Sequence, residues 1–383
     1  MVFAEVSFWL AAAWIAYVLV LYPGLAVAVG SLIERLRKPL LGDATPRISF
    51  IISAYNEEKA IEEKLRQTLA LDYPPDRLEV IVASDGSTDR TDEIVKEFGD
   101  SRVRLYRTEG RLGKTATLNG AVGAATGEIL VFSDATGVYS QNALRALAAR
   151  FADPRVGCVA GRVAYRYGRD STSEGFKGYQ RVAVAVRRAE NGFGDQTSVS
   201  GSIHAMRREL FRPGQPGFSM DVIDAVHTVV QGRRVVYEYA AVSLEDSRSS
   251  SRDEFNARLR ISLRNNSMAP YIVRELVQSR RWFYLFQMVS HKMMRWWLWV
   301  PLAIALAANL ALATQSLGYA MLGAGQLLLY AVGVAGLVGG RGEGRVGGVA
   351  AVAGFFLMGN AAMCVGTLRG LLGAQKPAWE PLR

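Results

Sequence analysis

Acidic side chains follow three short apolar runs of this 383-residue chain, each just beyond the point where its run ends. The runs are residues 48–52, 78–83 and 128–132. Short β-branched runs separated by helical segments are typical of parallel strands that are covered on both faces. In open α/β sheets the ligand binds beyond the carboxyl ends of the strands. We therefore expect Tyr55, Glu57, Asp85 and Asp134 to project into one crevice.

Carboxylates gathered beside basic residues at strand ends suit a nucleotide-sugar site. A diphosphate leaving group needs a divalent cation, and Mg2+ or Mn2+ is held best by hard oxygen ligands. Asp134 is the best candidate ligand, because it stands at the exit of a buried strand. The alternative is a helix cap, because Asp134-Ala135-Thr136 precedes a polar turn.

Composition and charge favour a lipid bilayer as the partner. The net charge is +10 and half of the residues are apolar. The basic residues flank hydrophobic spans and form no nucleic-acid reading motif, so we expect anionic lipid and no nucleic acid. Cys158 and Cys364 are too few for a disulfide framework or a zinc site, and we expect both to be small buried residues.

The first apolar stretch, Phe8 to Val29, is long enough to cross a bilayer as a helix. A signal peptide is the alternative, but Glu5 stands where a basic start is expected and no small-residue cleavage site follows. The basic residues Arg35, Arg37 and Lys38 come next. The positive-inside rule then predicts an integral protein of the inner or plasma membrane with a cytoplasmic catalytic domain.

The chain changes character again after residue 279. Residues 280–297 interleave aromatic and basic side chains, which is typical of helices at the lipid headgroups. Leu298–Ala313 and Leu317–Val338 are long enough to span, and Val349–Leu371 either crosses or re-enters. The predicted parts are a transmembrane helix (1–34), a cytoplasmic catalytic domain (35–279), amphipathic interface helices (280–297) and a transmembrane region of two to three helices (298–383).

Several motifs in combination carry a family resemblance. They are Ala54-Tyr55-Asn56-Glu57-Glu58, Asp85-Gly86-Ser87-Thr88-Asp89, Gly113-Lys114 with Leu118-Asn119, and Ser133-Asp134-Ala135. Together they resemble family 2 of the glycosyltransferases. Gly201 with His204-Ala205-Met206-Arg207-Arg208, Asp221 before Gly232, and Glu254-Phe255 before Arg258-Leu259-Arg260-Ile261 are similar to its membrane-embedded branch, which includes hyaluronan, chitin and cellulose synthases and ceramide glucosyltransferase. The resemblance implies an α/β GT-A fold, a Rossmann-like nucleotide-sugar-binding sheet, plus transmembrane α-helices.

The resemblance also implies how a UDP-sugar would be held. The Tyr55/Glu57 turn and Asp85 would bind the uridine part, and Lys114 would lie near the uracil or the phosphates. Asp134 would bind the Mg2+ or Mn2+ ion that bridges the diphosphate. The full implied donor-binding set is Ala54, Tyr55, Glu57, Asp85, Lys114, Ser133, Asp134, Arg258 and Arg260.

The chemistry implied by the resemblance is a single displacement that inverts the anomeric configuration. Asp221 would be the general base, taking the proton from the acceptor hydroxyl as it attacks the anomeric carbon. Arg258 and Arg260 would neutralise the departing diphosphate. Asp224 lies one helical turn further on and is either a cap or surface carboxylate or a helper in the site. It would be the base if the alignment were shifted by one turn.

Two departures from the family pattern bear on these expectations. The second acidic residue of the usual metal motif is replaced by Thr136, which weakens the expected metal affinity. The arginine motif has Ala257 and Arg260-Ile261 where the polymerases carry a glutamine or arginine and a final Arg-Trp. The missing tryptophan belongs to acceptor contact in processive synthases and favours a single transfer.

The remaining polar residues have simpler interpretations. His204, His227 and His291 are too scattered for a metal site and are expected to be structural or interfacial. Glu245-Asp246 is expected in a solvated turn. The arginines at 181, 187 and 188 indicate a solvated or lipid-facing helix side, with a channel for an anionic acceptor as the alternative.

The sequence thus predicts an inverting glycosyltransferase that moves a sugar from a UDP-sugar to a lipid-linked or glycan acceptor at the membrane. One alternative is a processive polysaccharide synthase that also secretes its polymer. The other is a catalytically silent, membrane-tethered GT-A binding module, which Thr136 makes conceivable.

Overall fold

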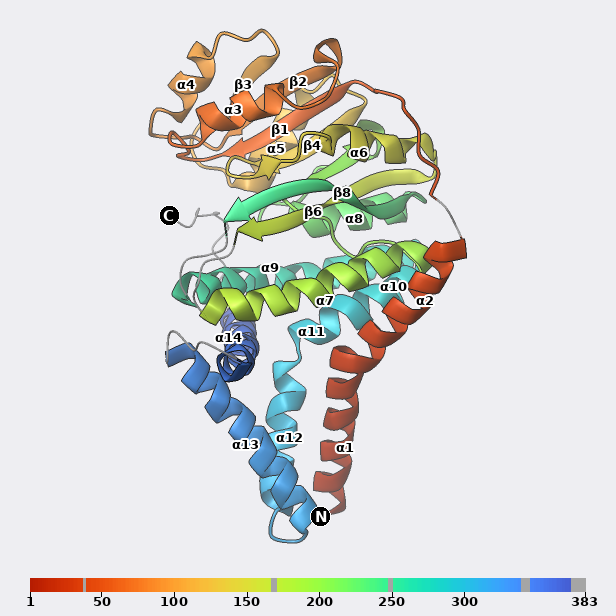
Figure 1. Cartoon of the computed structure of the whole chain (residues 1–383), viewed down its shortest axis with the longest axis vertical. Coiled ribbons are helices and arrows are strands. Elements are labelled where there is room, and N and C mark those ends of the chain that lie inside the picture. Colours follow the sequence, from red (N-terminus) through yellow and green to blue (C-terminus); the bar gives the residue numbers. More distant parts are fainter. Residues whose placement is uncertain (37–38, 167–170, 247–250, 339–344, 373–383) are drawn as a thin grey trace.

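The computed structural model of the chain describes residues 1–36, 39–166, 171–246, 251–338 and 345–372. The expected basic residues Arg37 and Lys38, most of the charged loop 341–345 and the tail from Lys376 lie outside these ranges. Three tiers are stacked along the long axis: an α/β domain, a layer of helices lying beneath it, and a stem of long apolar helices (Figure 1).

The α/β domain is built on one mixed sheet of eight strands, in the order β3-β2-β1-β4-β7-β6-β8-β5. The strands are β1 (Ile48–Ala54), β2 (Leu78–Ser84), β3 (Val103–Arg107), β4 (Ile129–Asp134), β5 (Val138–Tyr139), β6 (Val156–Arg166), β7 (His204–Arg207) and β8 (Arg234–Asp246). The first four strands run parallel, and β7 pairs antiparallel with both β4 and β6. The three apolar runs therefore lie side by side with their carboxyl ends at one edge, as predicted.

Helices cover both faces of the sheet, which is why β1 is buried along its whole length. The helices of this domain are α3 (Ile61–Leu69), α4 (Thr91–Glu97), α5 (Lys114–Gly123), α6 (Ala143–Ala149) and α8 (Met220–Val230), with short 3-10 turns η2 (Pro75–Arg77), η3 (Arg150–Ala152) and η4 (Arg208–Leu210). Apolar residues of α3, α4 and α6 form one core with the sheet. Those of α5 and α8 form a second core on the other face.

The sequence also predicts strands at 156–160, 200–206 and 235–237, and all three have other boundaries in the structure. β6 and β8 continue well past the apolar runs 156–160 and 235–237, because their second halves pair with each other after a register shift between Gly161 and Arg162. The second halves of both strands carry polar side chains, so the apolar pattern did not predict that the strands continue. β7 begins at His204, and Ser200 to Ile203 form a loop instead of the expected strand. Glu245 and Asp246 end β8 and do not form a turn.

The middle tier is a layer of helices between the sheet and the stem. It contains α7 (Ser171–Phe193), α9 (Ser251–Gln278), α10 (Trp282–Met288), the π-helical turn η5 (Val289–Met293) and α11 (Met294–Trp296). Residues 280–297 thus share this layer with two longer helices that precede them in the sequence (Figure 1). Apolar residues of α9 and α10 complete the second core of the sheet.

The stem contains the helices α1 (Val2–Ala16), α12 (Trp299–Leu312) and α13 (Leu317–Val338), and α1 continues through the π-helical turn η1 (Tyr17–Leu21) into α2 (Tyr22–Leu36). Pro23 has no N–H to donate to the preceding turn, which explains the widened turn at η1. By length and composition, Val2–Leu36, Leu317–Val338 and Gly348–Leu371 could each cross a membrane, and α10–α11 with α12 form a bent pair at 58°.

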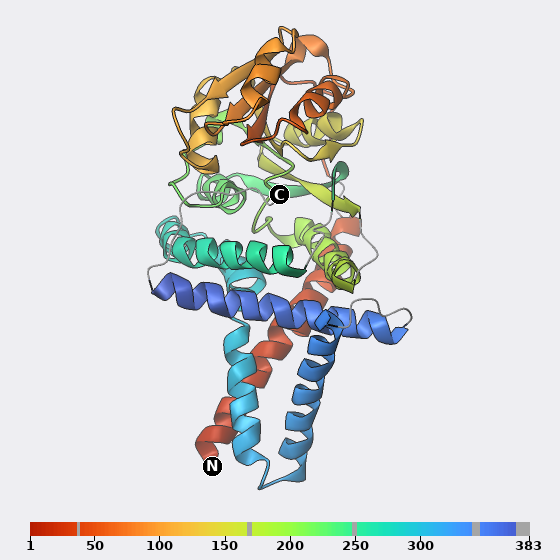
Figure 2. The same cartoon turned by 90° about the vertical axis from the view of Figure 1, so that its left-hand side faces the viewer.

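The last helix, α14 (Arg345–Leu371), does not stand parallel to the stem. Figure 2 shows it lying across the upper end of α13, beneath the middle tier. Its residues pack against α7, α9 and α13. The sequence left open whether this stretch crosses the membrane or re-enters it. In the structure it is a helix packed crosswise beneath the middle tier.

Candidate functional site

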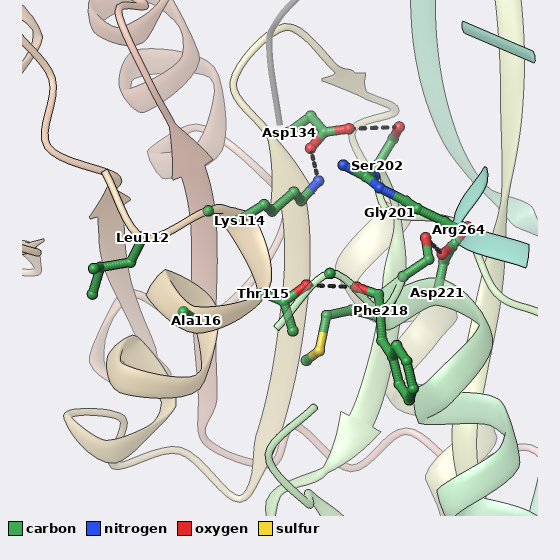
Figure 3. Close-up of a pocket in the computed structure, with 14 residues that line it drawn as sticks. Leu112, Lys114, Thr115, Ala116, Asp134, Gly201, Ser202, Phe218, Asp221 and Arg264 are labelled. Atoms are coloured by element: carbon green, nitrogen blue, oxygen red, sulfur yellow. Dashed lines mark hydrogen bonds and ion pairs between the residues drawn. The ribbon is translucent and has the colours of Figure 1, made fainter. Parts of the chain in front are cut away.

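A cavity of about 210 Å³ opens at the carboxyl edge of the sheet. Its walls come from the start of α5, the end of β4, the loop before β7, the start of α8 and one residue of α9 (Figure 3). The lining residues are Leu112, Gly113, Lys114, Thr115, Ala116, Asp134, Gly201, Ser202, Gly217, Phe218, Ser219, Met220, Asp221 and Arg264. The predicted metal ligand Asp134 and the predicted base Asp221 therefore face the same space.

Asp134 is the centre of a polar network inside this cavity. Lys114 forms an ion pair with it, Ser53 Oγ donates to its Oδ1 at 3.0 Å, and Ser202 Oγ donates to its Oδ2 at 3.2 Å (Figure 3). Burial alone would raise the pKa of Asp134, but Lys114 and the two serines outweigh it and hold the pKa below its usual range. The carboxylate is therefore ionised and already paired with a cation.

Asp85 holds the loop that carries Lys114. Its carboxylate is 3% exposed and accepts hydrogen bonds from Leu112 N at 2.8 Å, Gly113 N at 2.9 Å and Thr117 Oγ1 at 2.8 Å. It is absent from the lining of the cavity within the described chain. The structure thus shows Asp85 holding the Lys114 loop, and the contact with uridine that the resemblance implies stays a prediction.

The turn after β1 interlocks with the turn after β2. Asn56 adopts a positive φ of 55°, and its Oδ1 accepts a hydrogen bond from Thr88 N at 2.8 Å. Tyr55 stacks beneath the guanidinium of Arg111, with 4.1 Å from the arginine Cζ to the ring centroid. Burial raises the pKa of Glu57 to about 7, with Asp134 and Asp89 adding to the shift.

Two further predicted donor-binding residues, Ala54 and Ser133, lie at the ends of β1 and β4. Ala54 and Ser133 are buried, at 2% and 1% exposure. The Ala54 carbonyl accepts a hydrogen bond from Asp85 N at 3.0 Å, and Ser133 Oγ donates to the Asp134 carbonyl at 3.0 Å. Both residues therefore shape the strand ends that present Asp85 and Asp134.

Asp221 lies in the first turn of α8, next to the cap residue Ser219, whose hydroxyl donates to its Oδ1. The Asp221 carbonyl accepts a hydrogen bond from Val199 N at 2.7 Å, which ties this turn to the loop before β7. Arg264 extends from α9 across the cavity toward Ser202 (Figure 3). The carboxylate of Asp221 and the guanidinium of Arg264 thus line the same cavity as Lys114.

Asp224 is neither a cap nor a surface residue, contrary to one of the two sequence interpretations. It is fully buried, at 0% exposure, and its Oδ2 lies 3.1 Å from His204 Nε2. His204 Nδ1 lies 2.7 Å from the Ser200 carbonyl. This pair supports the loop that carries Gly201 and Ser202, while Asp221 is the acidic residue of α8 that reaches the cavity. All three histidines are structural, since His227 contacts Tyr271 and His291 contacts Glu190.

Arg258 and Arg260 are not among the residues that line the cavity in the described part of the chain. Arg258 pairs with Glu254 at 2.7 Å and lies over the ring of Phe355. Arg264 takes the place in the cavity that the sequence assigned to these two arginines. Neither Arg264 nor Ser202 is predicted as a site residue from the sequence, because no motif or spacing singles them out.

The donor set around Asp134 fits a cation that is shared with a substrate. Within the described ranges, no group of three or more His, Cys, Asp or Glu side chains gathers as a metal site. Mg2+ commonly takes one or two carboxylates and completes its coordination with water and substrate phosphates. Asp134 with the hydroxyls of Ser53 and Ser202 offers such a partial set. Thr136 is exposed and adds no carboxylate.

Comparisons with known proteins agree with this geometry. The family model described as glycosyl transferase family 2 matches residues 49–213. The chain is 33% identical over 123 residues to the probable glycosyltransferase YdaM of Bacillus subtilis, covering 30% of this chain and 29% of that protein. It is 30% identical over 178 residues to the beta-monoglucosyldiacylglycerol synthase of Synechocystis sp., covering 44% and 36%.

A third relative is the poly-beta-1,6-N-acetyl-D-glucosamine synthase of Staphylococcus epidermidis, 29% identical over 172 residues, covering 43% of this chain and 40% of that protein. The chain therefore spans well under half the length of these curated relatives. Among solved structures, the mannosyltransferase PcManGT from Pyrobaculum calidifontis, in complex with GDP-Man and Mn2+, has a TM-score of 0.68 at 23% identity. The match covers 96% of this chain and 100% of that one, so the shared fold extends to the apolar helices of the stem.

Proposed function

Residues 49–213 belong to glycosyltransferase family 2 and have its GT-A fold, and from this premise we propose that the chain is an inverting hexosyltransferase. It moves a sugar from a nucleoside-diphosphate sugar to an acceptor held at the membrane. UDP is the nucleotide that the sequence motifs favour, and GDP is the one in the PcManGT complex. We therefore propose UDP as the nucleotide of the donor and a membrane-held molecule as the acceptor.

One observation carries this proposal: a single cavity is lined by the Asp134–Lys114 ion pair, by Asp221 and by Arg264. A diphosphate needs positive charge and a hydroxyl nucleophile needs a base, and the cavity supplies both within one small volume. A structural cap would explain Asp134 or Asp221 separately, but not their convergence with two cations.

The residues of this cavity would divide the reaction between them. The acceptor hydroxyl attacks the anomeric carbon, its proton passes to Asp221, and the bond from that carbon to the diphosphate oxygen breaks. Lys114 and Arg264 stabilise the negative charge that collects on the departing nucleoside diphosphate. Mg2+ or Mn2+ bound by Asp134 and the diphosphate would supply further neutralisation. No covalent enzyme intermediate is needed.

The arrangement of the helices supports a membrane-bound acceptor. The cavity opens in the domain that rests directly on the middle tier, and the apolar stem lies below that tier (Figure 1). Arg35 follows the first apolar stretch, which favours a cytoplasmic catalytic domain in the inner or plasma membrane. The named relatives include a glycolipid synthase and a polymer synthase. A single lipid-extractable product would indicate a glycolipid transferase, and a ladder of lengths a processive synthase.

The test is sugar transfer by the purified full chain in lipid nanodiscs. Radiolabelled UDP-glucose, UDP-N-acetylglucosamine and GDP-mannose are compared, each with Mn2+, with Mg2+ and with a chelator. Asp221→Asn should lower turnover by about 10²–10⁴-fold while nucleotide-induced thermal stabilisation is retained. Asp76→Asn, a matched change on an 81% exposed side chain, should leave both unchanged. Unaltered turnover in Asp221→Asn would reject the assignment, and no transfer by any form would favour the silent binding module.

A further inference from the structure

Four cationic side chains converge in the middle tier, outside the cavity described above. Arg258 of α9 and Arg295 of α11 lie over the ring of Tyr179, and Arg187 of α7 and Lys292 of η5 act electrostatically on the same residue; we call these four the basic cluster. The guanidinium of Arg295 lies 5.4 Å from the Tyr179 ring centroid, and that of Arg258 lies 5.6 Å from it. Side chains from four separate elements thus concentrate positive charge at one place.

The basic cluster is only partly neutralised by the described residues. Arg258 pairs with Glu254, and Arg187 donates to Ser198 Oγ at 3.0 Å. The side chains of Lys292 and Arg295 form no ion pair or hydrogen bond with the residues that the structure describes. The field of these cations, chiefly that of Arg295, lowers the pKa of Tyr179 to about 8. An anion would therefore be favoured beside this ring.

An apolar groove lies next to the basic cluster. It is lined by Leu19 of η1, Leu329 of α13, and Gly348, Val349, Val352, Ala353 and Phe356 of α14. Leu19, Leu329, Val349 and Val352 are 43%, 44%, 65% and 50% exposed. The groove is almost free of polar surface. Its chemistry suits a hydrocarbon chain.

The groove and the basic cluster meet along one short segment of α14. Val352 of the groove approaches Gly178 of α7, the residue before Tyr179. Phe355, on the next turn of α14, lies 5.8 Å from the Tyr179 ring and 4.3 Å beneath the Arg258 guanidinium. A molecule with an apolar tail and an anionic head could therefore contact both at once.

The basic cluster is also within reach of the proposed base. Lys292 interacts electrostatically with Asp221 as well as with Arg187 and Arg295. A headgroup phosphate held by Lys292 and Arg295 would thus lie within the electrostatic range of Asp221. The donor diphosphate has its own cations, because Lys114 and Arg264 line the cavity and the cluster residues do not within the described chain.

We propose that the acceptor is an anionic phospholipid: its phosphate binds the basic cluster, its acyl chain lies in the groove beneath α14, and a headgroup hydroxyl faces Asp221. This rests on the proposed function, which it deepens by assigning the acceptor's chemical class. The charge complementarity and the adjoining hydrocarbon-lined groove together select a charged lipid over an uncharged lipid or a soluble sugar phosphate.

The experiment measures thermal unfolding of the full chain in detergent with four probes. These are dioleoylphosphatidylglycerol, dioleoylphosphatidylcholine, dioleoylglycerol and glycerol 3-phosphate. We expect stabilisation by phosphatidylglycerol above that by the other three. Lys292→Gln with Arg295→Gln should weaken this binding roughly tenfold or more, since it removes two charge-assisted contacts. Arg274→Gln, on the exposed side of α9, is the matched loss of charge and should have no such effect.

A second pair of variants tests the groove. Val352→Trp fills it and should weaken phosphatidylglycerol binding, whereas Leu322→Trp on the exposed side of α13 should not. Equal stabilisation by phosphatidylcholine, or an unchanged response in the double glutamine variant, would overturn the proposal. Stabilisation by glycerol 3-phosphate equal to that by the lipid would overturn its lipid part. Nucleotide-sugar stabilisation in the same samples reports the proposed function separately, so either can fail alone.

Discussion

Replacing Asp85 by alanine should disorder the loop that presents Lys114. The carboxylate receives hydrogen bonds from Leu112 N, Gly113 N and the Thr117 hydroxyl, and it is 3% exposed. Gly113 has a φ of 92°, which suits glycine alone, so the loop enters α5 in a conformation that needs support. Without the carboxylate, the backbone amides of Leu112 and Gly113 must donate their hydrogen bonds to water.

The expected magnitude follows from these contacts. A hydrogen bond to a charged group contributes about 1.5–3 kcal/mol, and bonds to one carboxylate are not additive. Counting the three hydrogen bonds as about two independent ones gives a loss of about 3–5 kcal/mol in the free energy of unfolding. The loss is not larger because the loop amides form hydrogen bonds to water instead. For a domain of this size the midpoint should fall on the order of 10 °C.

Thermal unfolding of the purified full chain measures the loss, with and without nucleotide. Asp85→Asn keeps the volume but turns an amide toward Gly113 N–H, so its midpoint should fall between those of wild type and Asp85→Ala. Asp76→Ala, at an 81% exposed side chain, should change nothing. A midpoint within 1–2 °C of wild type in Asp85→Ala, together with full nucleotide stabilisation, would show that the carboxylate is not what orders the loop.

Burial lowers the pKa of Lys64 to about 7 in the folded protein, against 10.5 in the unfolded chain. Between these two values the unfolded chain binds more protons, so the free energy of unfolding rises with pH. Lys64→Met should flatten this rise in thermal unfolding measured from about pH 6 to 9. A Cβ on Gly30 would lie 2.0 Å from a carbonyl oxygen of α7, so Gly30→Ala should cost about 1–3 kcal/mol of unfolding free energy, whereas Gly24→Ala on the same helix meets open space and should not. His204→Phe leaves the buried Asp224 unpaired and should cost about 3–5 kcal/mol, and adding Asp224→Leu should recover part of it in a double-mutant cycle.

The positions that sequence predicted well are those that local pattern determines. A short β-branched apolar run predicts a central strand that is buried on both faces. An acidic residue directly after such a run is then predicted at the carboxyl edge of the sheet. Asp134 was placed in this way, and the start of α8 was placed by its apolar positions after Ser219. Both predictions needed no knowledge of distant contacts.

The features that sequence could not predict depend on which side of a helix, or which loop, meets a distant element. Arg258 and Arg264 are six residues apart, about one and two-thirds turns, so they point to different sides of α9. The packing of α14 decides the outcome, because Phe355 takes the ring contact with Arg258 and leaves Arg264 facing the cavity. Likewise, Gly86 must be glycine because a Cβ would lie 2.5 Å from the Gly110 carbonyl. No local pattern contains that approach.

The helix α7 links the membrane stem to the proposed acceptor site. Near its C-terminal end, Glu190 is fully buried and accepts a hydrogen bond from Tyr22 Oη at 2.9 Å, with His291 Nδ1 at 2.7 Å. Tyr179 lies eleven residues earlier, about 16 Å along the same helix at 1.5 Å per residue. Glu190 thus fixes α7 to α2 and to η5, and because Lys292 belongs to η5, the basic cluster keeps a fixed position relative to the stem. The basic cluster would therefore bind a lipid headgroup at a fixed height above the stem. The distance from that headgroup to Asp221 would depend on the stem and not on a mobile loop.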